Sequence, residues 1–185
     1  MVMYFLKRFT SSLLVALAVL ALTPNSIIAK ERFIPTPSPT AEINSFELFW
    51  PISAGKTVGD SLFFVKNLKE NIRGLLIFGM PQKARYSALL ATKRVVEAEK
   101  LMFEGKEDLA TKSLGLAEIK LNMIGSNFGK HLSSGKTIPD DISVEMVGNL
   151  NNLEIFLTWL PTKYPLHKEK LDKLLGIVKS LQEKI

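Results

Sequence analysis

The sequence contains no cysteine and only two histidines among its 185 residues. Without cysteine the chain forms no disulfide framework and offers no thiol nucleophile or lipid-attachment cysteine. His131 and His167 are the only imidazoles, and no Glu-x-x-His pair occurs, whereas a transition-metal site needs several converging ligands. We therefore predict no metal and no cofactor, and a fold that is held together by core packing alone.

Complete motifs for catalysis or for binding nucleotides are also lacking. Gly55-Lys56-Thr57 resembles the end of a phosphate-binding loop, but Trp50 occupies the position of its first glycine. Ser53-x-x-Lys56 lacks the further elements of the serine–lysine enzymes, and no spacing singles out a pair of carboxylates. Basic residues are mixed with acidic ones, which argues against nucleic-acid binding. We predict that the protein is not an enzyme.

The first 29 residues are the most informative feature that is present. Lys7 and Arg8 precede an uncharged apolar run over residues 13–22, and a polar break and Ala29 follow. This order is typical of a bacterial secretory signal, with cleavage after Ala29. The alternative is an uncleaved anchor, since the apolar stretch lengthens when it is counted from the N-terminus. Either way we expect an extracytoplasmic protein, secreted or tethered to the cytoplasmic membrane by residues 1–29.

The remaining chain divides into a tether and one domain. In residues 30–45, Pro35, Pro37 and Pro39 alternate with threonine and serine, which favours an extended, polyproline-like tether. Residues 46–185 have the length and apolar content of a single domain with its own core.

Hydrophobic periodicity predicts five helices in the domain. The predicted spans are residues 60–78, 81–104, 107–132, 139–160 and 166–184. Asp60 is the expected N-cap of the first helix, and Pro161 is expected to end the fourth. The fold class that follows is all-α, an antiparallel bundle of four to five helices. Whether the last two helices share the core of the first three stays open.

Each predicted helix has an apolar stripe at helical spacing, which predicts its buried face. The second helix has a stripe of small residues, which lets a partner helix approach closely and is typical of a central helix. The predicted buried positions are Phe64 (or Val65), Leu68, Ile72 and Leu75; Ala84, Ala88, Ala91, Val95, Ala98 and Met102; Ala110, Leu114, Ala117, Leu121, Ile124 and Phe128; Met146, Leu150, Leu153, Leu157 and Leu160; and Leu171, Leu174, Val178, Leu181 and Ile185.

Four charged residues are candidates for a polar lock between helices, namely Lys66, Glu70, Arg94 and Glu97. Glu97 lies three residues after Arg94 and four after Lys93, so pairing along one helix is one interpretation. In the other, Arg94 and Glu97 reach across to Lys66 and Glu70 on the first helix, and the lock then sets helix register more than stability.

An aromatic cluster precedes the first predicted helix. Phe46, Phe49 and Trp50 lie directly before Pro51. We interpret them as a contact patch that lies across the helical body as a cap, and the alternative is a platform for a ligand.

The spacing Phe64-x-Lys66-x-x-x-Glu70, followed by Arg94-x-x-Glu97-Ala98, resembles a bacterial domain family of unknown function. Its members are found in exported or membrane-anchored proteins. The resemblance covers residues 50–125, and Phe64 stands where the family has tyrosine. It implies a helical extracytoplasmic domain and no activity.

These features favour an interaction or scaffold module of the bacterial cell envelope that binds an unknown envelope protein through a face of the bundle. The alternative is a carrier of a small ligand or lipid, with a cavity between helices. The aromatic residues Phe46, Phe49, Trp50, Phe63 and Phe64 motivate that alternative.

Overall fold

The computed structural model describes residues 42–185, so the predicted signal or anchor and most of the predicted tether lie outside the described residues. Of the described residues, 76% are helical and none is in a strand, which confirms the predicted all-α fold. The helices are α2 (Ser45–Leu48), α3 (Phe63–Leu75), α4 (Met80–Phe103), α5 (Glu107–Ser133), α6 (Asp140–Lys163) and α7 (Lys168–Gln182), with a 3-10 turn η1 at Pro165–His167.

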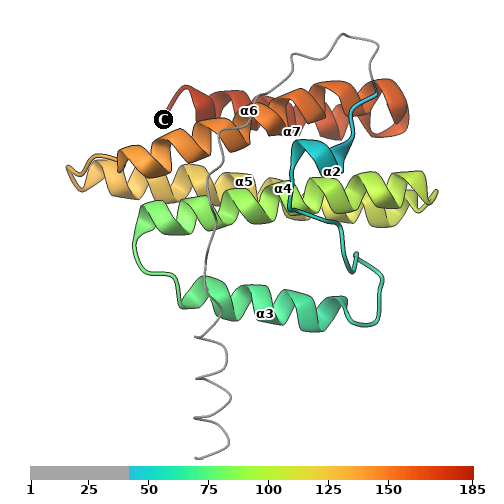
Figure 1. Cartoon of the computed structure of the whole chain (residues 1–185), viewed down its shortest axis with the longest axis horizontal. Helices are drawn as coiled ribbons and strands as arrows, with labels where there is room; N and C mark the ends of the chain where they lie inside the picture. Colours follow the sequence, from blue (N-terminus) through green and yellow to red (C-terminus); the bar gives the residue numbers. More distant parts are fainter. Residues whose placement is uncertain (1–41) are drawn as a thin grey trace, which may run out of the picture. The chain divides into compact units, whose positions relative to one another are not determined.

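The four long helices α4 to α7 surround one core. α4 packs on α5 and α6, and α7 packs on the same two helices (Figure 1). The turn between α4 and α5 is closed by hydrogen bonds from Gly105 to Met102 and from Lys106 to Leu101, and the φ of 70° at Gly105 is one that glycine adopts without strain. The last two predicted helices therefore share the core of the second and third.

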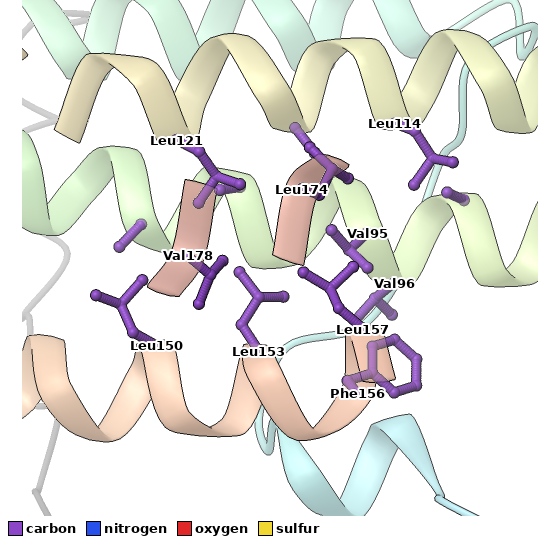
Figure 2. Packing of buried hydrophobic residues seen from close by; sticks show 14 of the residues in the cluster. Val95, Val96, Leu114, Leu121, Leu150, Leu153, Phe156, Leu157, Leu174 and Val178 are labelled. Carbon is purple, nitrogen blue, oxygen red and sulfur yellow. The ribbon is translucent and has the colours of Figure 1, made fainter. Parts of the chain in front are cut away.

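The core contains the apolar positions that periodicity predicts for α4 to α7. All predicted positions on α4, α5, α6 and α7 are buried, and only Ile185, three residues beyond the end of α7, is partly exposed. Figure 2 shows Leu153 and Leu157 of α6 pointing toward Val178 of α7 and Val95 of α4. The small residues of α4, such as Ala91, let neighbouring helices approach its backbone closely.

The predicted buried face of the first helix is wrong. Phe64 and Leu75 on α3 are 72% and 78% exposed. α3 lies on the side of α4 and α5 that faces away from α6 and α7 (Figure 1), and it turns Glu70 inward. The reason lies on α4, whose apolar positions are used against α5 and α6. What α4 offers to α3 is Arg94 and Glu97, which need charged partners when they are buried.

The start of α3 also differs from the prediction. Asp60 does not cap the helix, because its Oδ2 accepts the Thr57 N–H at 2.6 Å and closes a turn, and α3 begins at Phe63. This hydrogen bond lowers the pKa of Asp60. α3 ends at Leu75, before the predicted end near residue 78.

Pro161 does not stop α6, which continues to Lys163. Pro161 lacks the N–H that would bond to the Leu157 carbonyl, but only two residues of α6 follow it, so the lost hydrogen bond is confined to the last turn. The Tyr164 N–H then closes the last turn on the Leu160 carbonyl at 2.8 Å.

Residues 42–49 are fastened to α6. The domain thus includes residues at the end of the segment that was predicted as a tether, and Ile43 packs against the core. The contacts include an ion pair from Glu42 to Lys163, a 3.1 Å hydrogen bond from Asn152 Nδ2 to the Leu48 carbonyl, and an edge contact of Phe49 on Phe156 with ring centroids 5.2 Å apart. None of the helices within residues 42–185 combines the length and the apolar character that crossing a bilayer requires.

Because the outer side of α3 is exposed, we predict that a leucine-to-alanine substitution there costs much less stability than the same substitution in the core. Leu121→Ala removes a fully buried side chain and is expected to lower the free energy of unfolding by about 2–5 kcal/mol. Leu75→Ala changes a side chain that is 78% exposed, and we expect it to alter the free energy of unfolding by less than about 0.5 kcal/mol. Urea unfolding of the full chain, followed by circular dichroism, measures both values. Equal losses would show that the outer side of α3 is packed.

Candidate functional site

A cluster of buried charges joins α3 to α4. Lys66 and Glu70 come from α3, and Lys93, Arg94 and Glu97 come from α4. Arg94 is 1% exposed and Glu97 is fully buried. The structure thus brings together all four residues of the predicted polar lock and adds a second lysine. We call these five residues the ionic cluster.

Arg94 lies at the centre of the ionic cluster. Its Nη1 donates to both carboxylate oxygens of Glu97, at 2.9 and 2.7 Å, and its Nη2 donates to Glu70 Oε2. Pairing along one helix and pairing between helices therefore occur together. Lys93 differs from the prediction, because its Nζ donates to Glu70 Oε1 at 2.8 Å instead of pairing with Glu97.

Lys66 extends the ionic cluster to the loop before α3. Its Nζ donates to Glu97 and also to the backbone carbonyls of Ala54, at 3.1 Å, and Lys56. Burial lowers the pKa of the Lys66 ammonium, and the hydrogen bond and charge of Glu97 oppose this shift. One side chain thus connects the loop, α3 and α4.

The ionic cluster also has contacts with neighbouring aromatic and polar groups that were not predicted. The Phe63 ring lies 5.0 Å from the Arg94 guanidinium, and the Tyr86 hydroxyl donates to the backbone carbonyl of Glu70 at 3.0 Å. Ser113 of α5 donates to the Arg94 carbonyl at 2.8 Å. A signal for Tyr86 was available, because it lies seven residues before Lys93 and so shares its helix face.

The ionic cluster is suited to fixing the position of α3. Every carboxylate oxygen of Glu70 and Glu97 accepts at least one hydrogen bond from a cationic side chain. Burying charges carries a large desolvation cost, which leaves little net stability but makes other alignments of the two helices unfavourable. The arrangement therefore fastens α3 to α4 in one register.

The side of α3 that faces away from the ionic cluster is apolar and exposed. We call it the α3 outer face, and it consists of Phe64, Val65, Leu68, Ile72 and Leu75, continued beyond the helix by Leu76 and Phe78. Each of these side chains is at least 41% exposed, and Phe78 is 85% exposed. Contiguous apolar side chains on the surface of a folded domain mark a contact site.

The predicted aromatic contact patch divides into two parts. Phe49 is buried in the core, whereas Phe46 and Trp50 are about half exposed and contact each other edge to face, with ring centroids 4.6 Å apart. Phe46 also lines a pocket of about 160 Å³ beside Val96 and Glu99. Sites for small molecules are usually about 300–1,000 Å³. A carrier function stays a prediction.

The two histidines lie at separate places and act as hydrogen-bond partners. His131 Nε2 is 2.9 Å from the Thr137 carbonyl, near the end of α5. His167 Nε2 pairs with Glu107, and its Nδ1 is 3.5 Å from the Thr111 hydroxyl. The contacts of His167 link the start of α5 to the turn before α7.

More than half of the chain matches a known protein-domain family. The family model described as "Domain of unknown function (DUF5667)" matches residues 55–155, a range that includes the whole ionic cluster and the α3 outer face. This agrees with the predicted resemblance to a domain family of unknown function, whereas the motif of that resemblance and its exported context stay predictions. Comparisons with curated proteins and with solved structures gave no match.

The ionic cluster predicts a large effect of removing one charge. Glu97→Gln leaves the buried Arg94 without its two-oxygen partner, and we expect a loss of about 3–5 kcal/mol in the free energy of unfolding. The matched control is Glu145→Gln, which breaks the half-exposed Arg85–Glu145 pair and is expected to cost less than about 1 kcal/mol. Urea unfolding measures both. A loss for Glu97→Gln no larger than the control would contradict the structural role of the cluster.

The partly buried position of Glu99 predicts that replacing its carboxyl group changes thermal stability at neutral pH but not at acidic pH. Burial raises its pKa above the ordinary value of 4.5, against the opposing hydrogen bond from Ser45. The stability linked to protonated Glu99 is therefore present below pH 4.5 and is lost as the pH rises through the folded-state pKa. We expect Glu99→Gln to raise the Tm at about pH 7 and to have no effect near about pH 4. The exposed Glu183→Gln is the control, and equal Tm shifts for both variants at pH 7 would refute the assignment.

Proposed function

The chain belongs to the DUF5667 family of domains of unknown function, and we propose that it is a non-enzymatic interaction or scaffold module of the bacterial cell envelope. The observation that carries this proposal is the α3 outer face. A domain with a complete core in α4 to α7 holds a separate helix on its surface with the apolar side outward.

The way in which α3 is attached supports a role in presenting its apolar side chains to a partner. α3 contributes no buried apolar side chain to the core, and its one fully inward residue is Glu70. Ion pairs and hydrogen bonds hold it in place, so its apolar residues are free to contact something else. The ionic cluster contributes mainly to the orientation of α3, because buried ion pairs add little net stability compared with apolar packing.

The sequence before the domain supports the location. A basic start, a short apolar run and a polar break in residues 1–29 are typical of export, and residues 30–41 have the composition of an extended spacer. Under this proposal the domain lies outside the cytoplasm, secreted or tethered at the membrane. Its partner is then a component of the envelope, for which the sequence favoured a protein.

In-cell photocrosslinking tests the proposal directly. A photoreactive amino acid replaces Leu68 on the α3 outer face of the full chain, expressed in bacteria, and the control places it at Val144, an exposed apolar residue on α6. We expect light-dependent adducts to an envelope component at position 68 and none at position 144. Absence of adducts at position 68, or the same adducts at both positions, would refute an interaction role for this face.

A further inference from the structure

We propose that the envelope component bound by the α3 outer face is the anionic surface of a lipid bilayer. In this state α3 lies parallel to the membrane and inserts its apolar side chains between the headgroups. The inference rests on the proposed function and names the partner of the same face.

The charges around the α3 outer face are complementary to anionic lipid. α3 has three basic residues, Lys66, Lys69 and Arg73, and a single acid, Glu70, and Lys66 is engaged in the ionic cluster. That acid is turned away from the outer face and is paired inside the ionic cluster. Lys69 and Arg73 are both exposed on α3. Lys69 lies one turn after Val65 and so beside the outer face, whereas Arg73 lies toward α4, with its guanidinium 5.8 Å from the Tyr86 ring. Basic side chains beside an apolar stripe are typical of helices that bind anionic membranes.

The apolar residues are of the kinds that interfacial helices insert. Phe64 lies in the first turn of α3, Leu75 at its end and Phe78 just beyond, and they are 72%, 78% and 85% exposed. Side chains of this kind enter the boundary between headgroups and acyl chains by about 5–10 Å. α3 has 13 residues and is therefore about 20 Å long. It is too short to cross a bilayer, so the orientation that buries its stripe lies in the membrane plane.

A second copy of the chain fits this face less well. If two α3 helices pack face to face and antiparallel, the edges that carry Lys69 meet each other, and like charges oppose the contact. α3 presents no outward acid to relieve that repulsion. One short helix also supplies little area compared with the about 1,200–2,000 Å² of a stable protein interface. A protein partner would need an apolar groove with an acidic rim.

The ionic cluster makes membrane binding compatible with the folded domain. Because Lys66 and Glu70 are engaged with α4, the opposite side of α3 is the side that meets lipid. α3 has no apolar side chain to withdraw from the core before it binds. The bundle therefore docks without opening.

The experiment uses a fluorophore that is sensitive to its environment, attached to the full chain. The sequence has no cysteine, so Leu68→Cys gives a single attachment point on the outer face and Val144→Cys gives a matched exposed control. Each labelled chain is reconstituted into vesicles of phosphatidylglycerol and phosphatidylcholine, or of phosphatidylcholine alone. Spin-labelled lipid in the vesicles quenches any probe that enters the headgroup region. Both chains carry the same residues 1–41, so their difference reports on α3.

We expect the probe at position 68 to shift to the blue and to be quenched at least about twofold more than the probe at position 144 in the anionic vesicles. Phosphatidylcholine alone, or about 1 M salt, is expected to reduce this difference, because the charge contribution is then absent or screened. Lys69→Glu with Arg73→Glu is expected to reduce it as well. Lys130→Glu with Lys136→Glu makes the same change in net charge away from α3 and is expected to leave it unchanged.

Equal quenching at positions 68 and 144 overturns the lipid assignment. A blue shift at position 68 that depends on protein concentration and not on vesicles also overturns it, in favour of a second copy. If in-cell crosslinks from position 68 reach a protein while the vesicle probe stays unquenched, the lipid assignment fails and the proposed interaction function stands. If neither crosslinks nor quenching occur, both fail.

Discussion

A guanidinium that is removed from water must have its charge matched, and Arg94 is almost completely buried. Glu97 on the same helix balances this charge and accepts from Nη1, and Glu70 on α3 accepts from the equally buried Nη2. This requirement decides which side of α3 turns toward α4. Once Glu70 and Lys66 face inward, helical geometry places the apolar residues of α3 on the outside.

The surface properties of the domain thus follow from an electrostatic requirement at its interior. In small helical proteins an apolar stripe usually marks the side that packs on the core. Here α4 to α7 bury one another's apolar stripes, because α4 and α7 each pack on both α5 and α6. α3 joins this completed bundle through charges, and its stripe is left available for contact.

Much of the fold was predictable because periodicity reports burial directly when both neighbours of a helix are apolar. The stripes of α4 to α6, from Ala84 to Leu160, are buried as predicted. The same argument failed for α3, because the pattern shows that a helix has two unlike sides and does not show which side the neighbour prefers. The residues of the polar lock were identifiable from charge spacing, whereas the contact of Lys93 with Glu70 depends on how the two helices align.

The contacts of residues 42–49 have a mechanical consequence. They join Glu42, Leu48 and Phe49 to α6 before the chain reaches α3. Tension that enters the domain from its N-terminal side is therefore borne first by α6 and the core behind it. α3 lies downstream of this point of attachment, so a pull on the chain strains the bundle without tilting the helix that carries the outer face.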